Sequence, residues 1–276
     1  MRLLPFSVAV ITRRLRAAGC VFAEDEAQVL IAAAASATEL EAMLVRRIAG
    51  LPLEHVVGWA EFCGRRISVD PGVFVPRRRT EFLAREAVAL LRLAARKRQE
   101  VGGPESRPAV VVDLCCGSGA LGTVIAAAQE NVELHAADVE SVAVRCARRN
   151  VLPAGGSVYQ GDLFAPLPDS LRNRVDLLVV NAPYVPTDAI ATMPPEARIH
   201  EPLVALDGGR DGLDVQRRVI AAAPQWLAPD GHLLIETSSG QCPHTVALMS
   251  TSGLIPVVAS SPELDATVVI GRNAGG

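Results

Sequence analysis

An apolar, β-branched run that feeds directly into a glycine-rich turn limits this chain to a small number of folds. Residues 110–122 read Val-Val-Val-Asp-Leu-Cys-Cys-Gly-Ser-Gly-Ala-Leu-Gly, and an Ala-rich stretch follows over residues 123–129. The run predicts a buried strand, and the stretch predicts a helix whose first N–H groups can face polar ligand atoms. Glycines in the turn permit a left-handed backbone and close approach of a ligand.

The turn differs from two common phosphate-binding motifs. Its order, Asp-Leu-Cys-Cys-Gly-Ser-Gly, is not the dinucleotide fingerprint G-x-G-x-x-G, and it lacks the Gly-Lys-Ser/Thr of a P-loop. Asp113, the aspartate of this turn, can be interpreted in two ways. It either contributes to a ligand site or only orients the turn.

Three further strands are predicted to end in polar residues. Asp138 ends the run 134–138, about 20 residues after the glycines, where an acid suits a ribose diol. Asp162 and Leu163 follow a third candidate strand, although Asp162 is equally suited to cap a helix. The apolar run 175–180 leads into Asn181. Alternating strands and helices from residue 109 predict an α/β fold with a doubly wound, mostly parallel sheet, in which ligands bind at these strand ends.

The tetrapeptide Asn181-Ala182-Pro183-Tyr184 suits a planar –NH2 group. The Asn181 side-chain oxygen and the Ala182 carbonyl can each accept one N–H, and the Tyr184 ring can cover the flat face of the group. A nitrogen held in this way aims its lone pair out of plane, towards an electrophile. Taken alone, Asn-x-Pro is also a common strand-ending turn.

The order of these motifs resembles class I S-adenosylmethionine-dependent methyltransferases, and more narrowly the HemK/PrmC family of protein N(5)-glutamine methyltransferases. Other stretches carry the same resemblance. They are the linker segment Pro52–Phe62, the segment Phe74–Glu81 (similar to "IPRPETE"), Glu201–Leu213 (similar to "EP-x-x-AL-x-GG-x-DGL") and the late strand Gly231–Glu236.

The resemblance implies a cofactor, a reaction and a partner. S-adenosylmethionine would be bound by Cys115, Cys116, Gly117, Ser118, Gly119, Asp138, Asp162, Leu163 and Asn181. The acceptor amide would be held by Asn181, Ala182, Pro183 and Tyr184, with Asn181 and Tyr184 as the catalytic pair. The usual substrate in the family is the Gly-Gly-Gln loop of peptide-chain release factors, which places the protein in the cytoplasm.

Four positions depart from the family pattern. Ala182 replaces a proline, Arg79 replaces an acid, Cys115-Cys116 replaces Gly-Thr, and Leu163 stands where an aromatic residue is frequent. Two alternatives therefore stay open. One is a nucleic-acid methyltransferase that acts on the exocyclic amine of a flipped or single-stranded base, and the other is a cofactor-binding paralogue with a changed target.

Helical spacing predicts a small N-terminal domain with helices at 6–19, 24–35 and 38–49, the last with a Thr38–Glu41 capping box. We expect three units: a substrate-recognition domain over 1–52, a linker with a β-hairpin over 53–78, and a methyltransferase domain over 79–276. The hairpin is expected within 59–75, with Asp70-Pro71-Gly72 as a turn. A helix is expected over 80–98, a linker over 101–108, and an antiparallel edge pair from 254–259 and 266–271.

Charge and cysteine content add weaker constraints. Residues 1–108 carry 17 Lys and Arg against 12 Asp and Glu, so this part either faces an acidic partner such as RNA or has an ordinary solvated surface. None of the six cysteines forms a C-x-x-C pair and the five histidines are scattered, so no metal site is expected. The lack of a disulfide framework fits a reducing compartment, and no segment has the length of a membrane span.

Overall fold

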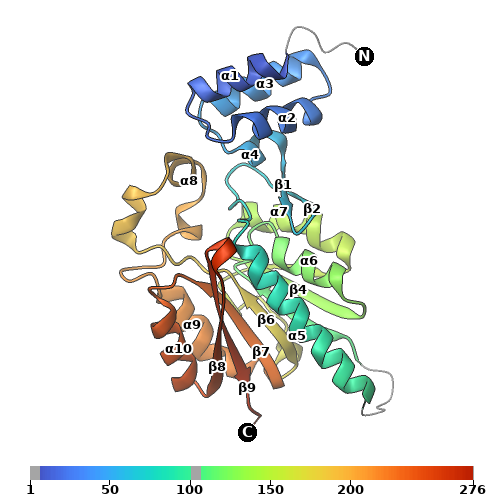
Figure 1. Ribbon diagram of the computed structural model, residues 1–276. Helices are drawn as coiled ribbons and strands as arrows, with labels where there is room; N and C mark the ends of the chain where they lie inside the picture. Colours follow the sequence, from blue (N-terminus) through green and yellow to red (C-terminus); the bar gives the residue numbers. More distant parts are fainter. Residues whose placement is uncertain (1–6, 101–106, 276) are drawn as a thin grey trace.

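The structure is a computed structural model that describes residues 7–100 and 107–275. Figure 1 shows a group of N-terminal helices at one end and an α/β sheet layered with helices at the other. The expected linker at 101–108 falls mostly outside the described residues. Within the described part of the chain, no helix is long and apolar enough to cross a bilayer.

The N-terminal helices are α1 (Val8–Ala17), α2 (Ala23–Ala33) and α3 (Ala37–Ile48), followed by the short α4 (Leu53–Val57). They enclose a core of their own, whose fully buried side chains include Ile11, Leu15, Leu30, Leu40 and Leu44.

The predicted capping box of α3 was wrong, because the observed box lies two residues earlier in the chain. The Ser36 hydroxyl caps the helix by accepting from the Glu39 N–H at 3.1 Å, and the Glu39 carboxylate accepts from the Ala35 N–H at 2.7 Å. Glu41 instead forms a two-bonded ion pair with Arg14 of α1, at 2.7 Å for each bond.

The hairpin lies within the expected segment but turns earlier than predicted. Strands β1 (Trp59–Phe62) and β2 (Arg65–Ser68) pair antiparallel around Cys63-Gly64, both of which have positive φ. Asp70–Gly72 belongs to a separate turn that follows the hairpin and is closed by a 3.1 Å bond from the Val73 N–H to the Asp70 carbonyl. Cys63 is a residue type that rarely adopts a left-handed backbone, so its position could not be predicted as a turn.

The sheet has seven strands in the order β5-β4-β3-β6-β7-β9-β8, in which the first five pair parallel and β9 pairs antiparallel with both β7 and β8. The strands are β3 (Ala109–Leu114), β4 (Val132–Asp138), β5 (Ser157–Gln160), β6 (Val175–Val180), β7 (Leu227–Thr237), β8 (Leu254–Ser261) and β9 (Ala266–Asn273). The helices around them are α5 (Thr80–Glu100), α6 (Ala120–Ala128), α7 (Ser141–Val151), α8 (Pro195–His200), α9 (Asp214–Ala222) and α10 (Cys242–Thr251). The predicted fold class and the antiparallel pair at one edge are confirmed.

The sheet separates two apolar cores, because successive side chains of a strand point to opposite faces. Val111 belongs to the core beneath α5, α6 and α7, whereas Val110 and Val112 belong to the core beneath α9 and α10. Helices on both faces of a parallel sheet define the doubly wound arrangement.

The parallel register brings three strand ends to one edge of the sheet. Leu114 pairs with Ala137 of β4 and with Val180 of β6, so the chain leaves all three strands at the same level. The predicted site residues at 115–119, 138 and 181–184 follow at this edge.

Candidate active site

A cavity of about 270 Å³ opens at the carboxyl ends of the parallel strands. Eleven of the twelve predicted site residues line it, and they come from four different strand ends. These residues are Cys115, Cys116, Gly117, Ser118, Asp138, Asp162, Leu163, Asn181, Ala182, Pro183 and Tyr184. The cavity therefore lies where doubly wound sheets bind small molecules, at the switch point of the strand order.

Gly119 is the predicted site residue that does not line the cavity. Its φ is +75°, and a Cβ placed on it would lie 2.7 Å from Val151 Cγ2 of α7. This position thus requires glycine for the start of α6 and for its packing against α7. Cys115 and Gly117 also have positive φ, each of 55°, so the turn curls around the cavity as the glycine pattern predicted.

The Asp138 carboxylate braces the turn from the neighbouring strand. Oδ2 accepts from the Gly117 N–H at 2.8 Å, and Oδ1 accepts from the Glu140 N–H at 2.9 Å. Burial raises the pKa of Asp138, and these backbone donors oppose the rise. Each oxygen keeps a second lone pair, which is the acceptor capacity that a diol ligand needs.

Asp113 holds the start of α6 and does not line the cavity. Its carboxylate is 1% exposed, Oδ2 accepts from the Gly122 N–H at 2.9 Å, and Oδ1 is buried without a hydrogen-bond partner among the described residues. Burial raises its pKa to about 7. The structure supports the interpretation of Asp113 as the residue that orients the glycine turn.

The rim of the cavity next to β5 carries an ion pair. Arg218 of α9 donates to Asp162 Oδ2 at 2.5 Å, with both side chains more than half exposed. Leu163 beside it has a φ of +49°, which turns the chain back over the cavity. Sequence reasoning identified Asp162 but not its partner, which lies 56 residues further along the chain.

Three residues outside the tetrapeptide hold Asn181 and Tyr184. Asn181 Nδ2 donates to Thr80 Oγ1 at 3.3 Å, and the Tyr184 hydroxyl donates to Glu236 Oε1 at 3.4 Å. The Arg79 guanidinium lies 5.8 Å from the centre of the Tyr184 ring, with Nε 3.5 Å from Glu236 Oε1.

These contacts change the acidity of both ionisable partners. Burial and the adjoining Glu236 raise the pKa of Tyr184 to about 12, so its ring remains a neutral phenol. Burial also raises the pKa of Glu236, while Thr80, Arg79 and Tyr184 oppose that rise.

The loop 207–213 packs against the backbone of the tetrapeptide, and this close contact requires glycine at two positions of the loop. A Cβ on Gly208 would lie 2.7 Å from the Pro183 carbonyl oxygen, and a Cβ on Gly212 would lie 2.2 Å from the Tyr184 carbonyl oxygen. The Gln241 side chain donates to the same Tyr184 carbonyl at 2.9 Å. Only residues without a side chain allow this approach of two backbones.

Glu201 joins the segment around α8 to the linker. It is 6% exposed, accepts from the Val75 N–H at 3.0 Å, and receives Arg77 Nη2 at 2.7 and 2.6 Å. Arg77 therefore has a buried partner. The two residues belong to different sequence motifs, and the sequence did not predict that they meet.

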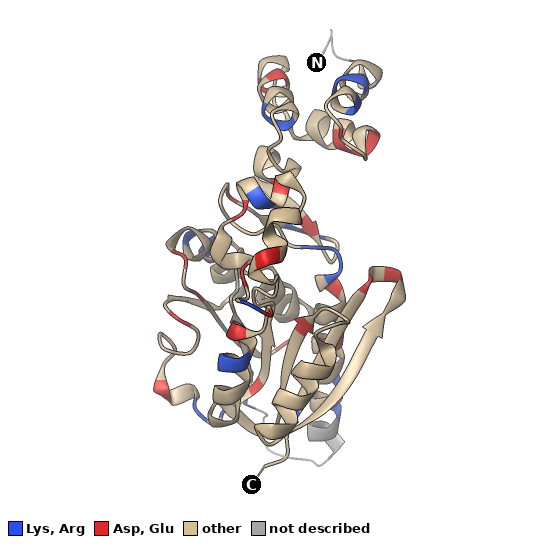
Figure 2. Cartoon of the chain, turned by 90° about the vertical axis from the view of Figure 1, so that its left-hand side faces the viewer, with Lys and Arg blue, Asp and Glu red and all other residues tan. Residues whose placement is uncertain are grey.

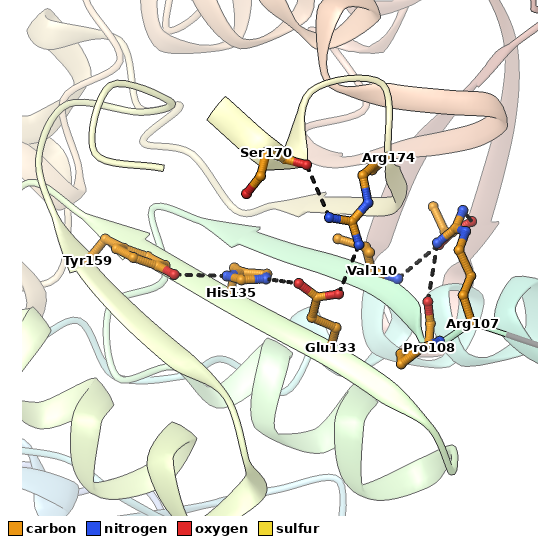
Figure 3. Close-up of polar contacts among 9 residues, drawn as sticks. Arg107, Pro108, Val110, Glu133, His135, Tyr159, Ser170 and Arg174 are labelled. Atoms are coloured by element: carbon orange, nitrogen blue, oxygen red, sulfur yellow. Dashed lines mark hydrogen bonds and ion pairs between the residues drawn. The ribbon is translucent and has the colours of Figure 1, made fainter. Parts of the chain in front are cut away.

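A second polar cluster lies on β4 and β5, away from the cavity (Figure 3). His135 Nδ1 is 3.0 Å from the Tyr159 hydroxyl, His135 Nε2 is 3.0 Å from Glu133 Oε1, and Arg174 reaches the other Glu133 oxygen at 3.3 Å. Both ring nitrogens of His135 have hydrogen-bond partners, so this histidine has a structural role in the cluster.

The cysteines are free thiols. Burial raises the pKa of both Cys115 and Cys116, which leaves their thiols protonated and poorly nucleophilic. Among the described residues, no three His, Cys, Asp or Glu side chains gather in a way that could hold a metal ion.

The site can now be compared with known proteins. A family model described as "Methyltransferase small domain" matches residues 104–208. The release factor glutamine methyltransferase of Geobacter sulfurreducens is 34% identical over 235 residues, which cover 84% of this chain and 77% of the relative. The chain belongs to the release factor glutamine methyltransferase family.

Other members and neighbours fit this assignment. The release factor glutamine methyltransferase of Gloeobacter violaceus is 37% identical over 77% of this chain and 71% of its own length. The 4-amino-L-phenylalanine/4-methylamino-L-phenylalanine methyltransferase of Streptomyces pristinaespiralis is also 37% identical, over 79% of this chain and 71% of the relative.

A solved structure supports the fold. The 16S rRNA N2 G1207 methyltransferase of T. Thermophilus, in complex with AdoMet and guanosine, aligns with a TM-score of 0.53 at 17% identity. The alignment covers 78% of this chain and 49% of the other. The shared methyltransferase fold confirms the predicted class I architecture.

Proposed function

We propose that this protein transfers a methyl group from S-adenosylmethionine to the side-chain amide nitrogen of a glutamine in the Gly-Gly-Gln loop of a peptide-chain release factor. The observation that carries the proposal is the position of Asn181-Ala182-Pro183-Tyr184 at the end of β6, lining the same cavity as the glycine turn. The family to which the chain belongs supports the acceptor. We expect it to act in the cytoplasm, where release factors work.

The cavity fits the cofactor through its donor set. We assign the methionine portion to the turn 115–119, the ribose hydroxyls to Asp138, and the adenine to the region of Asp162 and Leu163. The half-buried Asp138 carboxylate, with a lone pair on each oxygen beyond the one that accepts from the backbone, suits the two hydroxyls of a ribose. When bound, S-adenosylmethionine supplies an electrophilic methyl group and takes up the electron pair of the sulfur–carbon bond that breaks.

The chain's own residues must make an amide nitrogen reactive, which is difficult because its lone pair is delocalised. Asn181 Oδ1 and the Ala182 carbonyl accept the two N–H groups and hold the nitrogen at one place and angle. The Tyr184 ring covers the amide plane. As the nitrogen–carbon bond forms, positive charge develops on nitrogen, and the two oxygens stabilise it before the nitrogen loses a proton to water.

The charge distribution argues against the nucleic-acid alternative. Figure 2 shows acidic and basic positions close together on the N-terminal helices. Three of the basic residues there pair with acids, in Arg14–Glu41, Arg16–Glu24 and Arg47–Glu26. A phosphate-binding surface needs unpaired cations, so the ordinary solvated surface is the better interpretation of the excess.

We assign acceptor recognition to the N-terminal domain (1–52) and the linker (53–78). The linker's place in the cavity wall and the contact of α3 with α8 support this division. Arg47 of α3 reaches Glu196 of α8 at 3.6 Å, and Val73, Phe74 and Arg77 of the linker line the cavity.

The test is transfer of a labelled methyl group from S-adenosylmethionine to purified release factor, with its loop Gln→Ala variant as the matched control. We expect label on the first and none on the second. Total RNA and 4-amino-L-phenylalanine are parallel acceptors, the latter because one relative is named for it. Label on either of these alone would overturn the proposed acceptor.

A variant separates catalysis from cofactor binding. Asn181→Ala should lose most of the turnover and retain affinity for S-adenosylmethionine, measured by calorimetry. Undiminished turnover would remove Asn181 from the mechanism and leave a non-catalytic role for the tetrapeptide.

A further inference from the structure

Glu236, at the end of β7, is a buried acid that the mechanism above does not use. It is 2% exposed and lies behind the tetrapeptide, without lining the cavity. Oε1 is shared between the Tyr184 hydroxyl at 3.4 Å and Arg79 Nε at 3.5 Å, and Oε2 has no hydrogen-bond partner among the described residues. A buried carboxyl group with an unused oxygen is costly, so its presence beside the two catalytic side chains calls for a physical reason.

Thr80, the first residue of α5, connects this acid to Asn181. Its side chain is buried and accepts from Asn181 Nδ2 at 3.3 Å, and its hydroxyl is close enough to Glu236 to lower the pKa of that acid. A hydroxyl has one hydrogen to donate. Thr80 Oγ1 accepts from Asn181, so its own hydrogen is available to the Glu236 carboxylate, a group that only accepts.

The direction of these bonds decides which way the Asn181 amide faces. With Nδ2 turned towards Thr80, Oδ1 is turned away from it. This is the orientation in which Oδ1 can accept an N–H from the acceptor amide. The opposite orientation would present a donor to a donor.

We propose that Glu236 is a positioning residue that orients both catalytic side chains, Asn181 through the Thr80 hydroxyl and Tyr184 through its own hydroxyl. The proposal rests on the proposed function for the roles of Asn181 and Tyr184. Thr80 and Glu236 come from different elements, α5 and β7, so the helix start and the strand end together fix the geometry of the turn after β6.

Arg79 supplies the counter-charge in this chain. Its guanidinium contacts both Glu236 and the face of the Tyr184 ring, and it lowers the pKa of Glu236 against the effect of burial. It thereby favours the ionised acid that accepts from both hydroxyls. An acid at position 79 would repel Glu236, so the positive charge of Arg79 is part of the arrangement.

The first test compares the steady-state rates of four variants on release factor. Thr80→Val keeps the shape but removes the hydroxyl, Glu236→Gln keeps the volume but adds a donor, and Thr80→Ser restores the hydroxyl. We expect the first two to lower kcat on the order of 10²-fold, as small misplacements of reacting groups do, with unchanged cofactor affinity. Thr80→Ser should recover most of the rate.

Thr123→Val is the matched control. The Thr123 hydroxyl is buried without a hydrogen-bond partner among the described residues and does not line the cavity. The same chemical change there should leave kcat near wild type. Urea midpoints of all variants show whether a lost rate reflects a lost fold. Equal rates in Thr80→Val, Glu236→Gln and wild type would overturn the proposal.

The second test needs no acceptor, so it separates this proposal from the proposed function. The side-chain amide signal of Asn181 is identified in a ¹H–¹⁵N spectrum as the one lost in Asn181→Asp. We expect it to shift and to exchange faster in Thr80→Val and in Glu236→Gln, and to stay in place in Thr123→Val. A signal unmoved in both site variants would refute the positioning role, even in a protein that methylates release factor. If the signal shifts in a protein that does not methylate release factor, the positioning role of Glu236 stands and only the proposed acceptor is wrong.

Discussion

Asp113 is expected to make the folded protein less stable as the pH rises from 5 to 8. Burial raises the pKa of its carboxyl group from the ordinary 3.8 to about 7. Between these values the folded chain holds a proton that the unfolded chain has lost. The contribution to the free energy of unfolding is therefore fully present below about pH 4 and is lost as the pH rises through 7.

The size of the effect follows from the difference of about 3 pH units. At about 1.4 kcal/mol per unit, Asp113 changes the free energy of unfolding by about 4 kcal/mol in total, of which about 2.5 kcal/mol falls between pH 5 and 8. The group is wholly buried, so solvent does not screen it. Such a change is a large part of the stability of an ordinary domain.

Asp113→Asn isolates this contribution. The amide keeps the volume and the oxygen that accepts from the Gly122 N–H, and it does not ionise. Its –NH2 group falls where Oδ1 has no partner, at a pH-independent cost of about 1–3 kcal/mol. Urea unfolding followed by circular dichroism should show the variant gaining on wild type by about 2.5 kcal/mol from pH 5 to 8. Contributions from other acids cancel in this difference. Parallel stability curves for the two proteins would refute the argument that burial keeps Asp113 protonated.

Three further changes test other parts of the molecule. Gly119→Ala should destabilise the protein by about 1–3 kcal/mol, because the new methyl group meets Val151; an unchanged urea midpoint would contradict this packing. Arg47→Met should cost about 3–5 kcal/mol by leaving the buried Glu26 unpaired, whereas the double change with Glu26→Leu should restore most of the loss, as thermal unfolding will show. Asp138→Asn should weaken S-adenosylmethionine binding in calorimetry. An affinity equal to that of wild type would contradict the assignment of ribose binding to Asp138.

Much of the site could be predicted because its residues follow strands. The runs at 110–114 and 175–180 are strongly apolar and β-branched, so the sequence indicated where each strand ended. In a parallel sheet all such ends meet at one edge, which brings the glycine turn, Asp138 and Asn181 together although 66 residues separate its first and last members.

The supporting contacts could not be predicted in the same way. Thr80 meets Asn181 across 101 positions, and Tyr184 meets Glu236 across 52. Neither sequence separation is a helix or strand period, so a repeat pattern could not predict that these side chains meet. The position of the hairpin turn could not be predicted for another reason, because Cys63 adopts a backbone conformation that its residue type disfavours.

The position of β9 inside the sheet bears on what the sheet looks like before its last strand is in place. β9 lies between β7 and β8, and it pairs with both. Without β9, β8 has no strand partner, and it carries the exposed apolar side chains Ile255, Val257 and Val258. In that state β7 and β8 both have open backbone edges, which can pair with other chains. A chain that has lost β9, or in which β9 has come out of the sheet, would therefore be prone to aggregate.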